Sequence, residues 1–325
     1  MIISRTPYRV SFFGGGTDYP DWYRENGGAV LATTIDKYCY INCRYLPPFF
    51  EQKFRIVYSQ MELVNDLDEI RHPSVREVLK YLEVKQGVEI HHDGDLPSRS
   101  GLGSSSSFTV GLLNALYAMK GIMPSKTQLA QDAIHVEQEI IKENVGSQDQ
   151  VMSAFGGFNR VNFNESGFQV KPMTIDKEKL QELHNHLMLF FTGISRTASQ
   201  IAGEQIHQIP NKKLELTEMY KMVDQGVNIL NSNSDLLDFG RLLHESWMLK
   251  RSLTEKVSTL YIDYIYDTAL KAGATGGKIL GAGGGGFILF FVKPELQDHL
   301  KAALSGLLNI PFQFESSGSQ IIYNG

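Results

Sequence analysis

The segment best suited to chemistry runs from Leu96 to Ser107 and joins glycines to four consecutive serines. Gly101 and Gly103 let the backbone approach a ligand closely because they carry no side chain. The serines begin a stretch whose apolar residues recur at helical spacing, so they stand at the start of a predicted helix. Free backbone N–H groups and the dipole at such a helix end form an anion site. The segment therefore predicts a loop that binds a nucleotide triphosphate.

Two familiar phosphate-loop patterns do not match this segment. No Gly-Lys-Ser/Thr follows the glycines, so it is not the Walker A loop, and Ser106 stands where the dinucleotide fingerprint requires a third glycine. An NAD-type dehydrogenase also lacks support because no acidic ribose ligand appears in a strand–helix–strand setting. A flexible linker is the simplest alternative, but linkers do not lead into a helix with an apolar stripe.

Two acids, Glu137 and Asp149, follow the predicted loop. Glu137 lies on a predicted helix, and Asp149 lies in a Gly-Ser-Gln-Asp-Gln turn just beyond its end. Two acids beside one phosphate loop suit a Mg²⁺ ligand and a residue that accepts or orients a hydroxyl proton. Exposed carboxylates on a helix are the common alternative. The pair supports a catalytic site because it accompanies the predicted phosphate loop.

Near the amino terminus, a predicted strand runs into Gly14-Gly-Gly-Thr-Asp-Tyr19. This turn can expose Asp18, whose carboxylate could grip the hydroxyls of a polyol. Arg9, on the strand, could place a fixed positive charge near a transferred phosphate or an acidic catalytic residue. A glycine turn with a solvated Asp18 and Arg9 is the alternative.

A second glycine-rich segment, Gly273 to Phe287, precedes an apolar strand. So many glycines are costly to order unless the backbone must approach something closely. The segment predicts a second loop over the active site, and a β-turn with a bulge is the alternative.

The elements that must position these residues follow from periodicity. The predicted strands are Ile2–Phe13 and Val30–Tyr45, joined by a loop, and later Leu187–Thr192, Phe287–Val292, Phe312–Glu315 and Gln320–Tyr323. The predicted helices are Ser104–Met119, Lys126–Glu143, Lys177–His184, Lys213–Asn231, Leu236–Leu249, Leu260–Ala272 and Pro294–Leu307. Helical patterns of apolar residues become more frequent after residue 175, where we expect a domain boundary.

Composition limits the class of protein. The chain has 325 residues, 42% of them hydrophobic and 21% charged, which indicates a folded enzyme of about two domains. Its net charge of −5 argues against binding to nucleic acid or a membrane surface. Cys39 and Cys43 would share one face of a strand as buried thiols. With no signal-peptide pattern and no apolar run of roughly 20 residues, we expect a cytoplasmic protein.

Taken in order, three segments resemble the motifs of the GHMP kinases. Pro7–Tyr19 is similar to the amino-terminal substrate motif, Pro97–Ser107 to the Pro-x3-Gly-Leu-Gly-Ser-Ser phosphate loop, and Lys278–Phe287 to the carboxy-terminal glycine-rich motif. The resemblance spans almost the whole chain. It implies an α+β, two-domain GHMP kinase fold, with a ribosomal-protein-S5-like domain over residues 1–175 and a ferredoxin-like domain over residues 176–325.

The resemblance also implies roles for individual residues. ATP would be bound by Pro97, Gly101, Leu102, Gly103, Ser104, Ser105, Ser106 and Ser107. Mg²⁺ would be bound by Ser105 and Glu137, and Asp149 would be catalytic with Arg9 beside it. Some family members rely on positioning without such an aspartate, so general-base and positioning roles for Asp149 both stay open. The acceptor would be bound by Gly15, Gly16, Thr17, Asp18, Arg196, Lys278, Gly283 and Gly284.

Within the family, Phe13–Pro20 resembles the branch that contains heptose 7-phosphate kinases and bacterial fucokinases. Gly15-Gly16 replace the Glu-His of the galactokinase signature, which leaves room for a bulkier sugar. The implied reaction phosphorylates the C1 hydroxyl of D-glycero-D-manno-heptose 7-phosphate to the 1,7-bisphosphate, with Arg196 and Lys278 as first choices for binding the existing phosphate. L-Fucokinase activity and a non-catalytic sugar- and ATP-binding regulator are the alternatives. A homo-oligomer stays open.

Overall fold

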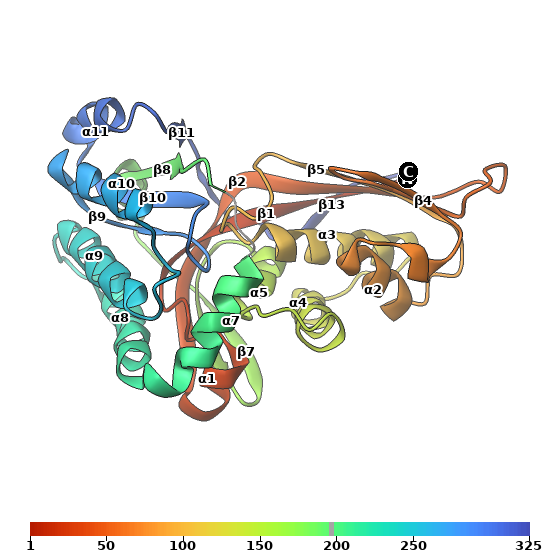
Figure 1. Cartoon of the computed structure of the whole chain (residues 1–325), viewed down its shortest axis with the longest axis horizontal. Coiled ribbons are helices and arrows are strands. Elements are labelled where there is room, and N and C mark those ends of the chain that lie inside the picture. The colour runs from red at the N-terminus through yellow and green to blue at the C-terminus, as the bar shows by residue number, and fades with distance from the viewer. Residues whose placement is uncertain (195–197) are drawn as a thin grey trace.

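A computed structural model describes residues 1–194 and 198–325 and arranges them as two β-sheets with helices packed against them (Figure 1). The larger sheet has the order β13-β1-β2-β5-β3-β4, and β12, β6 and β7 extend it beside β2. All its pairings are antiparallel except that of β3 with β5. Its strands are β1 (Ile2–Phe13), β2 (Gly28–Tyr45), β3 (Phe54–Val57), β4 (Met61–Val64), β5 (Val88–Gly94), β6 (Phe158–Asn164), β7 (Gly167–Pro172), β12 (Phe314–Glu315) and β13 (Gln320–Asn324).

Helices cover one face of this sheet (Figure 1). The central one is α3 (Ser104–Met119), which packs along β1 and β2 through a buried face that includes Phe108, Leu112 and Leu116. Burial of these apolar side chains provides the main driving force for this layer. The other helices of this part of the chain are α1 (Pro20–Asn26), α2 (Pro73–Tyr81), α4 (Lys126–Ile134), which continues as a π-helix over His135–Ile140, and α5 (Gln148–Phe155).

The smaller sheet is antiparallel, with the order β11-β8-β10-β9. Its strands are β8 (Leu187–Phe191), β9 (Ala274–Ile279), β10 (Phe287–Val292) and β11 (Leu308–Ile310). Trp247, Tyr266 and Phe290 belong to a second buried cluster between this sheet and its helices. The helices of this half are α6 (Lys177–Asn185), α7 (Ala198–Gln208), α8 (Lys213–Asn231), α9 (Leu237–Arg251), α10 (Leu260–Lys271) and α11 (Gln297–Ala303).

The two halves meet at the carboxy end of β1. The first residues of this strand alternate between buried and half-buried, whereas every residue from Thr6 to Phe13 is buried. Phe12 and Phe13 both pack edge-on against Phe239 of α9, with ring centroids 5.4 and 5.0 Å apart. The loop that follows β1 therefore emerges between the two halves.

Helices α3 and α8 and strand β10 match their predicted bounds to the residue. Three predictions were wrong in type. The link between β1 and β2 contains helix α1, the expected turn at Gly146–Gln150 runs into helix α5, and the first half of the second glycine-rich segment is strand β9. Cys39 and Cys43 are buried free thiols, as predicted.

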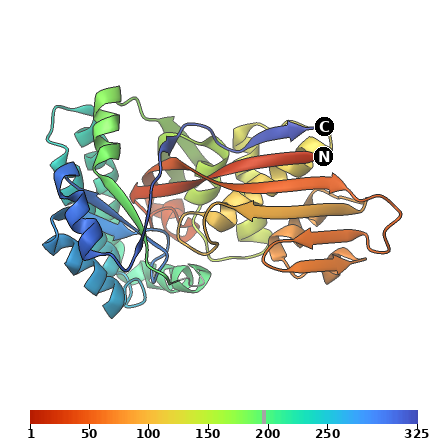
Figure 2. The same ribbon diagram turned by 90° about the horizontal axis from the view of Figure 1, so that it is seen from above.

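The last strands return to the first sheet. β13 pairs with β1, so the first and last strands of the chain lie side by side in Figure 2, and β12 pairs with β2. The boundary near residue 175 stays a prediction. Within residues 1–194 and 198–325, no helix combines the length and apolar character that crossing a membrane requires.

Candidate active site

The predicted phosphate loop leads directly into the start of α3. Arg99, Gly101 and Gly103 all have positive φ values, of 58°, 85° and 76°, so the backbone turns sharply before the helix. Gly103 is the residue that precedes the first turn, and no side chain caps this end of α3. The free N–H groups of that turn therefore remain available for an anion, as the sequence predicts.

Backbone hydrogen bonds fix this loop between β1 and β10. The N–H of Arg9 donates to the carbonyl of Leu102 at 3.0 Å, and the N–H of Phe287 donates to the carbonyl of Ser100 at 3.0 Å. A Cβ on Gly101 would lie 2.4 Å from the carbonyl oxygen of Leu280, so only glycine fits here. The second half of the carboxy-terminal glycine-rich segment, residues 280–286, thus lies directly against the phosphate loop.

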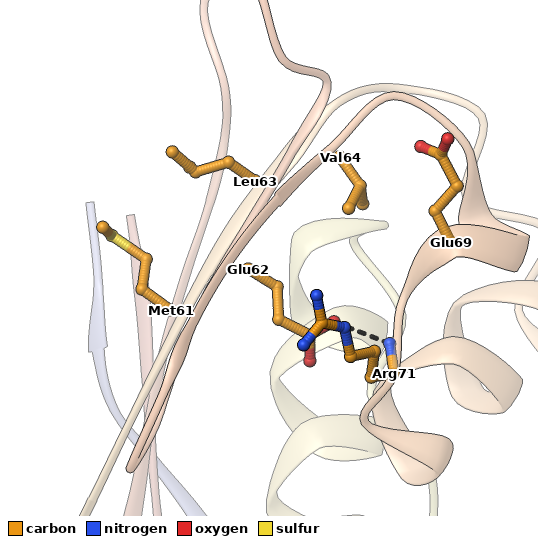
Figure 3. A pocket seen from close by; sticks show the side chains of 6 residues that line it. All are labelled: Met61, Glu62, Leu63, Val64, Glu69 and Arg71. Carbon is orange, nitrogen blue, oxygen red and sulfur yellow. Dashed lines mark hydrogen bonds between the residues drawn. The ribbon is translucent and has the colours of Figure 1, made fainter.

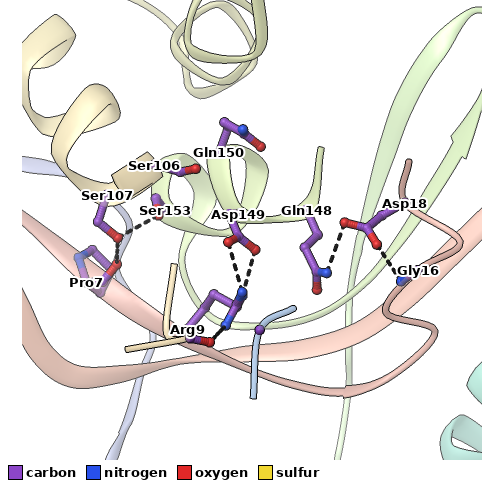
Figure 4. Close-up of polar contacts among 12 residues, drawn as sticks. Pro7, Arg9, Gly16, Asp18, Ser106, Ser107, Gln148, Asp149, Gln150 and Ser153 are labelled. Carbon is purple, nitrogen blue, oxygen red and sulfur yellow. Dashed lines mark hydrogen bonds and ion pairs between the residues drawn. The ribbon is translucent and has the colours of Figure 1, made fainter. Parts of the chain in front are cut away.

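The structure brings Arg9 and Asp149 together beside this loop (Figure 4). Nε and Nη2 of Arg9 donate to the two carboxylate oxygens of Asp149 at 2.7 and 2.8 Å. Nη1 donates to the carbonyl of Gly101 at 2.7 Å. The guanidinium is almost fully buried, whereas a quarter of the Asp149 side chain is exposed. This two-point contact fixes the carboxylate plane next to the phosphate loop.

Asp18 lies in the same region but is not exposed, so that part of the prediction was wrong. Its carboxylate accepts hydrogen bonds from the N–H of Gly16 at 2.8 Å and from Nε2 of Gln148 at 2.9 Å. Gly146 packs so closely that an added Cβ would lie 1.9 Å from Asp18 Oδ2. Burial raises the pKa of Asp18, and the nearby charge of Asp149 raises it further.

A second buried carboxylate, Glu137, lies on the π-helical segment. Its Oε2 accepts from the Ser106 hydroxyl at 2.8 Å and from the Gln150 amide, while its Oε1 has no hydrogen-bond partner among the described residues. Burial raises the pKa of Glu137 to about 7. The alternative of an exposed helix carboxylate is therefore excluded. Ser106, rather than the exposed Ser105, supplies the hydroxyl at this carboxylate.

The first turn of α5 connects these groups. Gln148, Asp149 and Gln150 are consecutive. Gln148 contacts Asp18 and Asp149 contacts Arg9 (Figure 4), and Gln150 contacts Glu137. Successive helical residues point about 100° apart, so one turn can reach three directions. Neither glutamine was predicted as a site residue. The sequence signal was the amide on each side of Asp149, which reads as an ordinary polar turn.

The Glu137 cluster fits a hard cation. Mg²⁺ prefers oxygen ligands and typically takes one or two carboxylates together with substrate phosphates. Glu137 offers an unpaired oxygen and a nearby serine hydroxyl, both close to the start of α3. The described residues contain no group of three or more His, Cys, Asp or Glu able to bind a metal. Phosphate oxygens would have to complete such a site.

Two buried lysines approach the site from the carboxy-terminal half. Lys278, on β9, is 2% exposed, and its Nζ donates to the carbonyl of Phe12 at 2.7 Å. Lys250, on α9, is 4% exposed, and its Nζ donates to the carbonyl of Gly281. Burial lowers the pKa of Lys250 to about 8, and burial lowers that of Lys278 well below its usual range. Arg196 lies outside the described residues.

Several hydroxyls that were predicted to bind ATP or the acceptor make hydrogen bonds within the protein. Thr17 donates to the carbonyls of Gly14 and Ala29 at 2.8 and 2.9 Å, and Ser107 bonds to the carbonyl of Pro7 and the hydroxyl of Ser153. Ser104 accepts from the N–H of Arg99 at 3.1 Å. The glycines fit around these contacts: a Cβ on Gly15 would lie 3.7 Å from Gln148 Nε2, and Gly283 and Gly284 turn with positive φ values beside Val257.

A hollow of about 460 Å³ lies elsewhere, at the edge strand β4 (Figure 3). It is lined by Met61, Glu62, Leu63, Val64, Glu69 and Arg71. Its most buried acid, Glu62, accepts from the backbone N–H groups of Arg71 and His72 and from the Tyr58 hydroxyl. The carboxylate is fully engaged, so this hollow offers little chemistry.

Comparisons with known proteins match both halves of the chain to one family. Two family models match the chain, "GHMP kinases N terminal domain" over residues 73–157 and "GHMP kinases C terminal" over residues 228–309. D-glycero-alpha-D-manno-heptose 7-phosphate kinase of Campylobacter jejuni is 31% identical over 317 residues, covering 93% of each chain. The L-fucokinase/L-fucose-1-P guanylyltransferase of Bacteroides fragilis is 25% identical over 90% of this chain, which spans about a third (35%) of that longer protein.

Among solved structures, a D-glycero-D-manno-heptose 1-phosphate kinase from Bacteroides thetaiotaomicron superposes with a TM-score of 0.74. The two chains are 25% identical, and each is covered completely. The likeness therefore extends through both sheets and the site between them.

Proposed function

The chain belongs to the GHMP kinases, and on that basis we propose that it transfers the terminal phosphate of ATP to the C1 hydroxyl of D-glycero-D-manno-heptose 7-phosphate. The product would be the 1,7-bisphosphate, an intermediate on the way to nucleotide-activated heptose. The observation that carries this proposal is the Arg9–Asp149 pair, fixed between the uncapped start of α3 and the Asp18 loop.

Different residues would contribute to different parts of phosphoryl transfer. The backbone of the phosphate loop and the first turn of α3 would bind the phosphates of ATP. Mg²⁺, held by Glu137 and a serine hydroxyl with phosphate oxygens, would neutralise developing charge. Asp149 would accept or orient the proton of the acceptor hydroxyl, and Arg9 would hold its carboxylate in place. In this account Ser106 replaces Ser105 as the first choice for the metal, because Ser106 contacts Glu137.

The acceptor assignment follows from similarity and from space. The Campylobacter jejuni relative acts on a heptose 7-phosphate by its name, and it matches this chain along nearly its full length. Gly15 lies beside Gln148 and Gly16 beside Leu216, and both lack the larger side chains of the galactokinase signature. Asp18, with the other acceptor-loop residues, would bind sugar hydroxyls after exchange of its present hydrogen bonds.

L-Fucose is the second candidate acceptor. The Bacteroides fragilis relative supports it, since the matched part of that protein extends over most of this chain. A non-catalytic regulator would have no need for Asp149, Arg9 and Glu137 in one arrangement. A cytoplasmic location and a homo-oligomer stay predictions.

An ADP-release assay over several acceptors tests the proposal. The panel contains heptose 7-phosphate, fucose, galactose, mannose and mevalonate, each with ATP and Mg²⁺. We expect kcat/KM for heptose 7-phosphate to exceed that for every other compound at least tenfold. A higher value for fucose would replace the acceptor, and binding of a sugar without ADP release would support the regulator instead.

A further inference from the structure

Lys250 and Lys278 are buried lysines, and neither forms an ion pair with a carboxylate among the described residues. Each ammonium group has three N–H donors, yet each makes one hydrogen bond within residues 1–194 and 198–325, to a backbone carbonyl. The three residues outside those ranges, Ser195 to Thr197, include no acid. A buried charge of this kind is unfavourable unless a partner compensates it.

The two lysines approach one place from different elements. Lys250 lies in the last turn of α9 and reaches Gly281, which packs directly on Gly101 of the phosphate loop. Lys278 lies on β9 and reaches Phe12, at the end of β1 just before the Gly14–Asp18 loop. Helix α9 and strand β9 pack tightly, since a Cβ on Gly276 would lie 2.1 Å from the carbonyl oxygen of Gly240. The two ammonium groups are thus held by rigid neighbouring elements.

The surrounding charges place the pair on the acceptor side of the site. Burial and the nearby positive charges of Lys250 and Arg9 lower the pKa of Lys278, and the nearby carboxylate of Asp18 opposes this effect. Burial and the charge of Arg9 lower the pKa of Lys250, and the nearby charges of Asp18 and Asp149 oppose this effect. Arg9 is already paired with Asp149. Asp18 accepts from amide donors, so neither nearby carboxylate pairs with the two lysines among the described residues.

We propose that Lys250 and Lys278 together form the receptor for a phosphate monoester that the acceptor already carries. This inference rests on the proposed kinase activity and names the residues that would recognise the phosphate of its acceptor. The unused N–H donors of both ammonium groups would bind the phosphate oxygens, and the two positive charges would be neutralised when the acceptor enters. Arg196 and Lys278 were the first choices for binding this phosphate, and in this proposal Lys250 takes the place of Arg196.

The test compares two acceptors that differ by the phosphate group alone. Lys250→Met and Lys278→Met are assayed with heptose 7-phosphate and with unphosphorylated heptose, and binding of both sugars is measured by calorimetry without ATP. We expect at least a 30-fold loss of kcat/KM and of affinity for the sugar phosphate, with less than a threefold change for the free sugar. Lys256→Met, at an exposed lysine paired with Glu204, is the matched control.

Folding does not obscure the result, because methionine fills a similar volume and removal of a buried charge is often neutral or stabilising. Lys250→Gln removes the charge but retains an N–H donor for the carbonyl of Gly281. It therefore tests the charge separately from the hydrogen bond to the loop. It should behave like Lys250→Met.

Equal losses on both sugars would overturn the receptor and assign the lysines to the transferred phosphoryl group. Wild-type activity from Lys250→Gln would overturn the role of the Lys250 charge. If the wild-type protein phosphorylates neither sugar, the proposed function itself fails, and the calorimetric comparison still decides whether the lysines bind a sugar phosphate.

Discussion

At the scale of single residues, the site depends on which carboxylate is paired and which is not. Asp149 has a two-point contact with Arg9, Asp18 is bound by amide N–H groups, and Glu137 keeps one oxygen free. A carboxylate whose two oxygens both accept from one guanidinium is fixed in its orientation. Asp149 is therefore suited to position the acceptor hydroxyl, and Glu137 is suited to bind a cation.

The free oxygen of Glu137 leads to a prediction about pH. Burial raises its pKa to about 7 in the folded protein, above the usual value near 4.5. The unfolded chain thus loses this proton at lower pH, and the folded state becomes less stable as pH rises from about 4.5 to 7 without metal. Replacing Glu137 by Gln removes this effect. We expect Glu137→Gln to gain roughly 2–4 kcal/mol relative to wild type between pH 5 and pH 8.

Denaturant unfolding in metal-free buffer at several pH values measures this difference. Differences at a single pH include lost hydrogen bonds to Ser106 and Gln150, so the slope with pH is the informative quantity. A difference that does not change between pH 5 and pH 8 would contradict a raised pKa at Glu137.

Residue roles could be predicted only in part from the sequence. Arg9, Glu137 and Asp149 were predicted as site residues from their chemistry and order, and the structure brings Arg9 to Asp149. The resemblance implied Ser105 as the metal-binding serine, whereas Ser106 is the serine whose hydroxyl contacts Glu137. Which serine faces Glu137 depends on the rotation of α3 about its axis. The isolation of Lys250 from carboxylates could not be predicted, because it depends on contacts between segments far apart in the chain.

At the scale of elements, two glycine loops and the first turn of α5 assemble the site. Gly101 has a φ of 85° and would place a Cβ 2.4 Å from the Leu280 carbonyl oxygen. Gly121 has a similar φ of 72°, but no atom lies within 4 Å of its would-be Cβ. An alanine would meet the same backbone strain at either position. The two positions differ in that a second loop closely approaches Gly101 but not Gly121.

We therefore expect Gly101→Ala and Gly121→Ala to behave differently. Gly121→Ala should cost about 1 kcal/mol of stability, from its positive φ alone, and retain full activity. Gly101→Ala should cost more and lower kcat/KM at least 100-fold, since the phosphate loop must move away from residues 280–286. Thermal unfolding and ADP release measure both. Equal effects of the two variants would show that the contact between the loops has no importance.

Elements with strong periodicity were predicted well, and those with weak signals were not. The apolar stripe of α3 and the length of α8 gave bounds that agree to the residue. Helix α5 begins within a polar Gly-Ser-Gln-Asp-Gln stretch that reads as a turn. Strand β9 contains Gly276 and Gly277, which lower its strand propensity. Gly276 permits α9 to approach closely, whereas Gly277 packs against β10.

At the scale of the whole molecule, the predicted two-domain GHMP kinase fold is confirmed, and its two halves share the site. The amino-terminal half supplies the phosphate loop and three carboxylates, while the carboxy-terminal half supplies the second glycine loop and two lysines. The return of β12 and β13 to the first sheet joins the halves further. Pairing between strands so distant in sequence leaves no local signal, so it could not be predicted.

The most direct test of phosphoryl transfer at this site is ³¹P NMR of the reaction with heptose 7-phosphate, ATP and Mg²⁺. We expect one new anomeric phosphate ester for each ADP formed, and at least a 100-fold slower reaction with Asp149→Asn. Release of inorganic phosphate without a new ester, a phosphate at another hydroxyl, or an unchanged rate in Asp149→Asn would contradict the account.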